Sequence, residues 1–313
     1  MAYPASPMAY PASSYARALA LLAVVVLAWG FNWPVTKTIV REMSPLWSTT
    51  ARAAIASLVL AVLLWWRGEF IIPKRGDVAV VLSTSLLHMT AYSALVAAGI
   101  QFLPAGRAIV LGYTTPIWVT LGARVFLGEA ISVGRASGVG LGLAGLLLIF
   151  SPASLDWHDK AALIGSGMIT LAAICWAANI VYVRAHRWIS TPFQLVFWQL
   201  LLSTLVLAGT AVLVDGVPHV AWTPRLVALL AFSGVICTAL AHWAMLVVNR
   251  SLPAVTTSLG LLATPAIGIV SGAVFLGEAF DPSLSAALAL IAGGIATGIV
   301  SDRPRALPPK PSG

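Results

Sequence analysis

The sequence feature that most constrains this chain is a five-residue segment, Phe-Leu-Gly-Glu-Ala, that occurs twice. It lies at residues 126–130 and again at 275–279, which is 149 residues later. The same offset relates Leu-Pro-Ala at 103–105 to Leu-Pro-Ala at 252–254. A repeat of this length indicates a structural duplication, so we predict a fold of two homologous halves.

A second set of matched residues lies nearer the start of each half. Trp29 and Asn32 match Trp176 and Asn179 at an offset of 147, two fewer than the offset above, which indicates a short insertion in the second half. The predicted segments are a disordered tail at 1–17, a first five-helix repeat at 18–151, a second at 161–301, and a disordered tail at 302–313.

The composition is that of a membrane protein. Hydrophobic residues make up 59% of the chain and charged residues only 9%, whereas roughly a quarter of a soluble domain is charged. The net charge of +8 does not indicate a nucleic-acid partner, because the cations are scattered singly between apolar runs and form no basic stripe. Cys175 and Cys237 both lie in apolar runs, so neither predicts a disulfide or a metal site.

Hydropathy predicts the number of helices. A helix needs roughly 20 apolar residues to cross a bilayer, and the lipid bilayer is therefore an expected partner. We predict an all-α integral membrane protein with ten transmembrane helices. They are expected at 18–39, 45–66, 77–99, 104–126, 134–151, 161–183, 192–214, 225–248, 253–276 and 282–301.

The distribution of Lys and Arg predicts the orientation, because cytoplasmic loops are enriched in both. Twelve of the eighteen lie on the side of the two termini, five lie on the other side, and Arg52 lies inside a span. This asymmetry places both termini in the cytoplasm. Each half has five spans, an odd number, so the second half enters the membrane from the opposite side. The halves are therefore predicted to form an inverted repeat.

An inverted repeat is typical of secondary transporters, whose substrate site lies near the bilayer midplane between the repeats. Exchange of the roles of the two halves then produces conformations that open to opposite sides, which is alternating access. The alternative is an old duplication in a static scaffold.

Several motifs support a specific resemblance. The first helix carries Trp-Gly-Phe-Asn-Trp-Pro at 29–34, the second begins with Ala-Arg-Ala-Ala-Ile-Ala at 51–56, and Leu-Pro-Ala-Gly-Arg at 103–107 leads into Thr-Pro at 115–116. Each fourth helix of a repeat ends in Phe-Leu-Gly-Glu-Ala. With ten spans in two repeats, the chain resembles the drug/metabolite transporter superfamily and, within it, the EamA-type exporters.

Within that group the chain most resembles the bacterial exporters of aromatic and other neutral amino acids. The resemblance implies a multi-pass protein of the inner membrane that moves amino acids and related small metabolites outward, without a cofactor. The alternative is a drug or nucleotide-sugar carrier of the same superfamily. An enzyme is disfavoured, because no helix carries metal-ligand spacing and no Gly-x-Ser-x-Gly elbow occurs. The sequence leaves the choice between monomer and homodimer open.

Polar and aromatic side chains deep in the spans are the candidates for a substrate cavity. His88 and Tyr92 lie one helical turn apart, with Ser85 on the same face, and Thr238 and His242 repeat the pattern. Indoles can line an apolar cavity while their N–H groups find partners. The alternative for each residue is helix packing or interhelical hydrogen bonding. The predicted lining residues are Trp29, Asn32, His88, Tyr92, Trp176, Asn179, His242 and Trp243.

Five further residues receive predicted roles. Arg52 can bind a substrate carboxylate, or it can extend to headgroups or helix-end carbonyls. Pro116 and Pro265 remove a backbone hydrogen bond in matched spans and are predicted hinges. Glu129 and Glu278 are each predicted to cap the N-terminus of the helix that follows, and the alternative for both is a gating or proton-carrying carboxylate.

Two other observations bear on mechanism and on depth. No Asp or Glu lies deep in a span, which argues against a carboxylate-driven proton or sodium pump. Coupling through the mid-span His88 and His242 is the alternative to equilibrative export or exchange down a gradient. Trp33 lies near a predicted span end and is expected to belong to an aromatic belt at the membrane interface.

Overall fold

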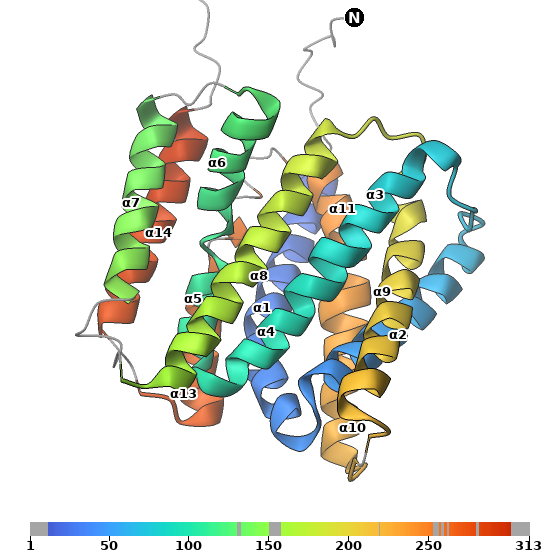
Figure 1. The fold of residues 1–313 in the computed structure, drawn as a ribbon. Helices are drawn as coiled ribbons and strands as arrows, with labels where there is room; N and C mark the ends of the chain where they lie inside the picture. Colours follow the sequence, from blue (N-terminus) through green and yellow to red (C-terminus); the bar gives the residue numbers. More distant parts are fainter. Residues whose placement is uncertain are drawn as a thin grey trace, which may run out of the picture.

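The computed structural model describes residues 12–129, 133–149, 158–218, 220–252, 257, 260–261, 263–279 and 282–301. In these ranges all regular secondary structure is helical. The helices form one elongated bundle in which most axes run between the same two ends (Figure 1). The helix α1 begins and α14 finishes at the same end of the bundle, the upper end in Figure 1.

The first half of the chain contains five predicted spans, three of which are single helices and two of which are divided. Its elements are α1 (Ala12–Glu42), α2 (Pro45–Trp66), η1 (Arg75–Asp77), α3 (Val78–Ser83), η2 (Thr84–Tyr92), α4 (Ser93–Gly99), η3 (Ile100–Phe102), α5 (Ala105–Gly112), α6 (Thr115–Leu127) and α7 (Val133–Ile149).

The second half follows the same order. Its elements are α8 (Lys160–Ala185), α9 (Pro192–Asp215), α10 (Pro224–Ala231), η4 (Phe232–Leu240), α11 (Ala241–Ser251), α13 (Ala263–Leu276) and α14 (Pro282–Ser301). The segments η1 and η3 are 3₁₀ turns, whereas η2 and η4 are π-helices of nine residues each.

Most boundaries lie within a few residues of the predicted ones, because proline and capping residues start several helices. Ser44 accepts a hydrogen bond from the Trp47 N–H at the start of α2, and Pro45 opens that helix. The predicted tail at 1–17 is too long, since α1 begins at Ala12. The rest of that tail, residues 1–11, and the tail at 302–313 lie outside the described residues.

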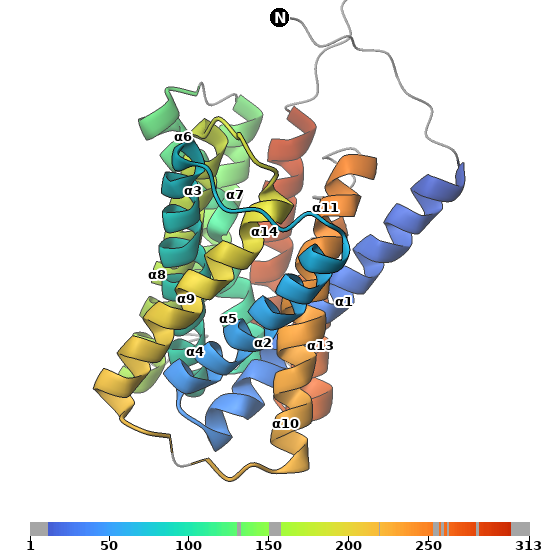
Figure 2. The same cartoon turned by 90° about the vertical axis from the view of Figure 1, so that its right-hand side faces the viewer.

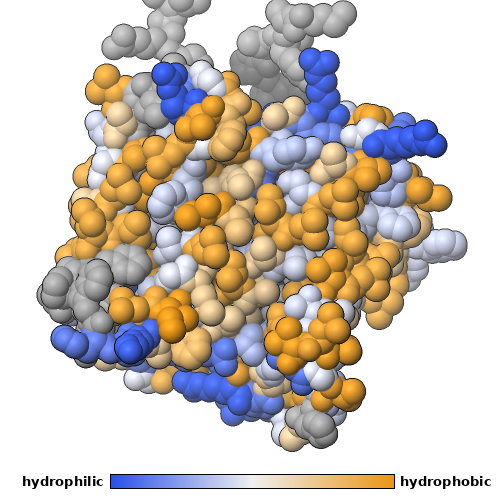
Figure 3. Space-filling model, viewed as in Figure 1, coloured by the Kyte–Doolittle hydropathy of each residue, from blue (hydrophilic) through white to orange (hydrophobic). Residues whose placement is uncertain are grey.

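The surface and the helix lengths are those of a multi-pass membrane protein. Seven described helical segments are long and apolar enough to cross a membrane, namely Ala16–Glu42, Pro45–Trp66, Arg75–Phe102, Ala105–Leu127, Lys160–Ala185, Pro192–Asp215 and Pro224–Met245. Three shorter apolar helices, Ala136–Leu148, Ala263–Leu276 and Pro282–Thr297, lie at the fifth, ninth and tenth predicted spans. Figure 3 shows a largely hydrophobic face with hydrophilic groups gathered at its two ends. Seven segments therefore meet the length criterion, and the count of ten spans stays a prediction.

The repeated motif produces the same turn in both halves. Gly128 and Gly277 follow the ends of α6 and α13 with φ of 67° and 65°. This left-handed conformation is favourable for glycine and closes a helix C-terminus. The Glu129 N–H donates to the Ala123 carbonyl, and the Glu278 N–H donates to the Gly272 carbonyl. The chain therefore turns back in the same way after both helices.

The fourth predicted span is broken rather than kinked. The helix α5 ends at Gly112, Tyr113 and Thr114 form a short turn, and Pro116 lies in the first turn of α6. Proline is tolerated there because its missing N–H needs no partner in a first turn. Pro265 is the third residue of α13; much of the chain immediately before α13 lies outside the described residues. Movement about either proline stays a prediction.

The helices pack in pairs that join the two halves. The helices α7 and α14 pair at one side of the bundle (Figure 1), and α2 pairs with α9. The helix α1 lies beside α11 and α13 (Figure 2), while α8 contacts α4, η2 and α6. The main apolar core surrounds α5, whose residues 108–111 are fully buried. This arrangement leaves an interior space between α1, α2, η2, α8 and η4.

Candidate functional site

A cavity of about 160 Å³ lies in the interior of the bundle. Both halves of the chain contribute to its wall, chiefly through α1, α2 and η2 from the first half and α8, η4 and α11 from the second. Of the eight predicted lining residues, the structure places six on this wall, namely Trp29, Asn32, His88, Tyr92, Trp176 and His242. Arg52 also lies on it. A role in substrate binding stays a prediction for each of them.

Two π-helical segments present much of the polar wall. His88, Met89 and Tyr92 project from η2, and Cys237 and Thr238 from η4. The wider winding shows in the Thr238 hydroxyl, which donates to the carbonyl five residues earlier in η4. Segments of π-helix are rare and occur frequently at functional sites. Both segments were predicted to be α-helical, so their π-helical winding differs from the prediction.

The winding also corrects one predicted face. Ser85 is fully buried and does not line the cavity, although α-helical spacing placed it beside His88 and Tyr92. Residues that share a face are more positions apart in the sequence of a π-helix than in that of an α-helix, because each backbone hydrogen bond of a π-helix spans five residues. The predicted three-residue face is therefore wrong for Ser85.

The helix α1 is joined to η4 by hydrogen bonds that fix one side of the cavity. The Trp29 indole N–H donates to the Cys237 carbonyl at 3.1 Å. The Cys237 thiol lies 3.2 Å from the Ala28 carbonyl. The Ser233 hydroxyl donates to Asn32 Oδ1 at 2.7 Å. These contacts hold the Trp29 ring at the wall, and the Asn32 amide N–H groups have no hydrogen bond within the described residues.

The helix α8 meets η2 on the opposite side through aromatic contacts. The rings of His88 and Trp176 stack with centroids 5.1 Å apart and an angle of 3° between them. Tyr92 completes the group, with its ring 5.2 Å from Trp176 and 5.6 Å from His88. The Tyr92 ring is tilted by 55–56° to the other two, so the three rings form an angled, partly polar cluster.

The two repeat-related asparagines have different environments. Asn179 is 4% exposed, and its Oδ1 accepts hydrogen bonds from the Ser83 and Thr84 hydroxyls at 3.2 and 3.1 Å. Among the described wall residues Asn32 is present and Asn179 is not. Asn179 therefore joins α8 to the third predicted span. This is interhelical hydrogen bonding, the alternative to cavity lining for this residue.

The neighbouring residues His242 and Trp243 also have different environments. His242 lies on the cavity wall, 6.3 Å from the Trp29 ring and 6.5 Å from His88. Its Nδ1 lies 2.6 Å from the Thr238 carbonyl. A carbonyl can only accept, so Nδ1 carries the hydrogen and Nε2 is left as an acceptor in the neutral ring. Trp243 instead packs against the apolar clusters at α2 and α1, outside the described wall of the cavity.

Arg52 is half-buried on α2 and faces this interior. It is the only Lys, Arg, Asp or Glu side chain among the described residues that line the cavity. Within the described residues it has no hydrogen-bond or ion-pair partner. A side chain on the cavity wall is available to a ligand, whereas the headgroup or helix-end roles would direct it outward.

Two aromatic wall residues were missed by sequence reasoning. Trp33 is 8% exposed and lies on the cavity wall, so its assignment to an interfacial belt is wrong. Tyr113, in the turn between α5 and α6, lines the same space. Trp33 lies four residues after Trp29, and that helical spacing was a signal that could have found it.

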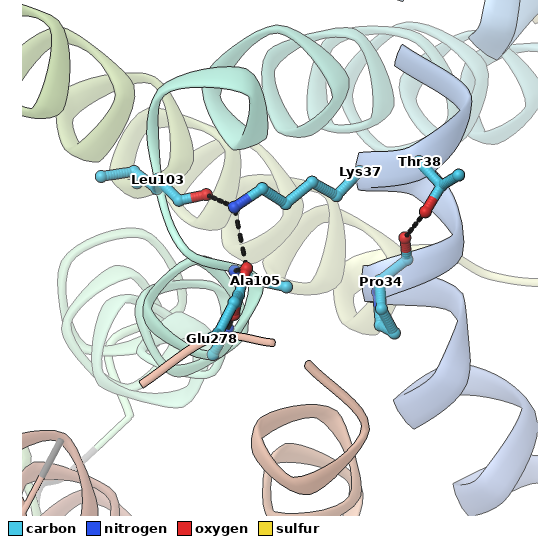
Figure 4. A network of polar contacts seen from close by, with 7 residues as sticks. Pro34, Lys37, Thr38, Leu103, Ala105 and Glu278 are labelled. Carbon is cyan, nitrogen blue, oxygen red and sulfur yellow. Dashed lines mark hydrogen bonds and ion pairs between the residues drawn. The ribbon is translucent and has the colours of Figure 1, made fainter. Parts of the chain in front are cut away.

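Glu278 caps a helix other than the one predicted. Its carboxylate accepts hydrogen bonds from the N–H groups of Ala105 at 2.8 Å and Gly106 at 3.3 Å, at the N-terminus of α5 (Figure 4). The predicted target was α14, the next helix in the chain. The N-terminus of α5 attracts the anion through its free N–H groups and the helix dipole.

A lysine completes that contact. Lys37 Nζ lies 2.8 Å from Glu278 Oε1 and donates to the Leu103 carbonyl at 2.7 Å, so it links α1 to both segments (Figure 4). The two side chains of the ion pair are only 12% and 13% exposed.

The repeat produces a second ion pair at the other end of the bundle. Arg184, the residue 147 positions after Lys37, lies 2.7 Å from Glu129 Oε1. These side chains are 45% and 28% exposed. Each pair therefore joins the first helix of one half to the turn after the fourth helix of the other, with one pair buried and its counterpart open to solvent.

Metal binding finds no support in the described residues, which contain no group of three or more His, Cys, Asp or Glu placed to hold an ion. The cavity instead combines aromatic faces, hydrogen-bond donors and one guanidinium. Such a combination suits a small organic ligand.

Comparison with known proteins gives a consistent result. The model of the EamA-like transporter family matches residues 16–151 and, separately, residues 163–299. The "Uncharacterized transporter YoaV" of Bacillus subtilis is 27% identical over 271 residues, which cover 87% of this chain and 92% of that protein.

Two further comparisons concern a relative with a named substrate class and a solved structure. A "Probable amino-acid metabolite efflux pump" of Salmonella typhimurium is 28% identical, with 92% of this chain and 95% of that protein covered. A solved crystal structure that is 18% identical superposes with a TM-score of 0.64 and covers 92% of this chain and 99% of its own, which shows a shared fold.

Proposed function

Because the chain belongs to the EamA-like transporter family of the drug/metabolite transporter superfamily, we propose that this membrane transporter exports amino acids by alternating access. Aromatic and other neutral amino acids are the favoured substrates, together with related small metabolites. The observation that carries the proposal is the interior cavity, whose described wall combines indole rings from both halves, phenol rings and a single guanidinium.

The cavity wall supports the substrate class. Trp29, Trp176 and Tyr92 present ring faces and edges on which a flat side chain can pack. Arg52 is suited to a carboxylate, because a guanidinium and a carboxylate match in geometry and form charge-assisted hydrogen bonds. The efflux-pump relative of Salmonella typhimurium carries a name of the same substrate class.

The proposed architecture is ten transmembrane helices in two inverted five-helix repeats, 18–151 and 161–301, with the cavity between them. Three observations support it. The helices α1 and α8, which open the two halves, run in opposite directions through the bundle (Figure 1). The family model matches the chain twice. The contacts of α1 with η4 and α13 are repeated by those of α8 with η2 and α6.

Alternating access is supported by the two repeat-related ion pairs. Lys37–Glu278 and Arg184–Glu129 lie at opposite ends of the bundle and differ in exposure. If the halves exchange conformations, the buried pair becomes the open one and the open pair becomes buried. Pro116, in the first turn of α6, and Pro265, the third residue of α13, are the proposed hinges.

The second candidate is a drug or nucleotide-sugar carrier. A cavity of about 160 Å³ is small beside the roughly 300–1,000 Å³ of drug-sized pockets. A nucleotide sugar carries two phosphates, and one guanidinium in the described wall is a weak match for them. Both observations favour the amino acid.

The decisive experiment is uptake of radiolabelled phenylalanine into proteoliposomes, with and without an imposed pH gradient. We expect saturable uptake that unlabelled aromatic amino acids inhibit, and little response to the gradient, because no carboxylate lies deep in a span. Absence of uptake by correctly folded protein would reject amino acids as substrates and leave the family assignment intact.

A cavity variant tests the site at the same time. We expect Trp176→Ala to weaken the apparent affinity for phenylalanine about tenfold, through loss of ring contacts. Trp66→Ala is the matched control, because Trp66 is 85% exposed at the end of α2 and its loss should leave uptake unchanged. Equal uptake by both variants would remove Trp176 from the proposed site.

A further inference from the structure

The charge balance of the cavity is incomplete. An unpaired cation inside a membrane protein is costly and is ordinarily compensated by a carboxylate or by backbone carbonyls. Arg52 has no such partner within the described residues. Seven of the ten acidic residues of the chain are described, and none of them lines the cavity. The other three, Asp156, Asp281 and Asp302, lie outside the predicted spans in the sequence. A ligand carboxylate would supply the negative charge that the described wall does not.

We propose that the cavity recognises the carboxylate of its substrate and gives no compensation to an ammonium group. Its preferred ligands are then monocarboxylates of net charge −1 with an aromatic or apolar body, such as the deaminated analogues of aromatic amino acids. This inference rests on the proposed function in one respect, that the same cavity is the substrate site.

The groups around Arg52 are suited to a carboxylate. Tyr92 and Cys237 lie within electrostatic range of the guanidinium. The Asn32 carbonyl oxygen accepts from Ser233, so the Asn32 amide N–H groups remain to donate into the cavity. The Tyr92 hydroxyl has no hydrogen-bond partner within the described residues and is a second donor. Several donors and one cation thus lie on the wall of the same cavity.

The same wall offers an ammonium group no countercharge among the described residues. His242 Nε2 and the lone pairs of the Thr238 hydroxyl are neutral acceptors. They can accept a hydrogen bond from an amine or amide, but they carry no countercharge. An ammonium brought into this space also meets the repulsion of Arg52, which is strong where water is excluded. A zwitterionic amino acid therefore gains from its carboxylate and loses at its amino group.

Three ligands with the same ring separate these effects. Binding of 3-phenylpropionate, L-phenylalanine and phenethylamine to the purified full-length protein is measured by titration calorimetry in low-chloride buffer. We expect 3-phenylpropionate to bind about tenfold more tightly than phenylalanine, because it lacks the ammonium group. A tenfold difference is about the size of the contribution of one hydrogen bond to a charged group. Phenethylamine, which has the ammonium alone, should not bind. Equal or tighter binding of phenethylamine would overturn the inference.

Substitution of Arg52 and excess chloride supply the controls. Arg52→Gln should abolish binding of 3-phenylpropionate, and Arg52→Lys, which keeps the charge but not the planar fork, should weaken it. Trp66→Ala should bind as the wild type does. Retained binding in a folded Arg52→Gln protein would contradict the inference. Displacement of 3-phenylpropionate by chloride at similar concentrations would reduce the site to one for any small anion, and would also contradict it.

The outcome is independent of the transport result. Phenylalanine uptake without binding of 3-phenylpropionate would overturn the inference and leave amino acid export standing. Binding of 3-phenylpropionate without phenylalanine uptake would support the inference and reject amino acids as the exported class.

Discussion

At the scale of single residues, the cavity depends on a close contact between a glycine and a tryptophan. A Cβ atom placed on Gly112 would lie 2.9 Å from the Trp33 ring, and that ring is almost completely buried. A buried indole cannot move aside without disturbing its neighbours, because the interior of a protein is closely packed. Gly112 at the end of α5 therefore determines where Trp33 meets the cavity.

We accordingly expect Gly112→Ala to destabilise the protein by about 1–3 kcal/mol, the usual effect of overpacking. Its thermal unfolding midpoint in detergent should fall. Gly209→Ala on α9 is the matched control, since a Cβ there meets nothing within 4 Å. Alanine favours a helix over glycine by up to about 1 kcal/mol, so the control should be neutral or slightly more stable. A midpoint unchanged by Gly112→Ala would show that the Trp33 ring adjusts freely.

At the scale of elements, the N-terminus of α5 is held by a carboxylate from the other half of the chain. Glu278 accepts two backbone hydrogen bonds from α5 and one charge-assisted hydrogen bond from Lys37 on α1. Three separate segments therefore depend on one side chain. The matching pair at the opposite end, Arg184–Glu129, is more exposed and is screened by solvent.

The difference in exposure predicts a difference in stability. Glu278→Gln should cost about 1.5–3 kcal/mol, because it removes the charge from buried hydrogen bonds. Arg184→Gln, which removes the exposed pair from its other side, should cost less than about 1 kcal/mol, as loss of an exposed ion pair does. Unfolding of both variants in detergent, followed by circular dichroism, measures the difference. A larger loss for Arg184→Gln would mean that the exposed pair is the more important one.

At the scale of the whole molecule, both ends of the described chain lie at one end of the bundle (Figure 1). Five cations lie on the opposite side of the predicted topology, against twelve on the side of the termini. This bias predicts cytoplasmic termini. The orientation follows from charge outside the helices, whereas the packing of the helices would be the same in either orientation.

A reporter fused at two positions tests this orientation. A fluorescent protein that folds only in the cytoplasm should be bright when fused after Gly313, and a periplasmic phosphatase should be inactive there. Fusion within residues 150–157, between α7 and α8, should give the reverse pattern. The same reporter signal at both positions would contradict an odd number of spans in the second half.

Local sequence patterns predicted the helices well because hydropathy, proline and capping residues act over short distances. The start of α2 at Pro45 and the turns at Gly128 and Gly277 follow from neighbouring residues alone. The internal repeat similarly indicated where equivalent side chains would occur. Hydropathy could not show the break at Tyr113, because both α5 and α6 are apolar.

The partner of each polar side chain depended instead on packing between distant segments. Glu278 caps α5 across the two halves, and Asn179 turns to Ser83 and Thr84 while its counterpart Asn32 stays on the cavity wall. Hydrogen-bond partners that lie about a hundred residues or more apart in the chain leave no periodic signal in it. The π-helical winding of η2 and η4, which selects His88 and Thr238 for the wall and excludes Ser85, is likewise a property of the packed bundle.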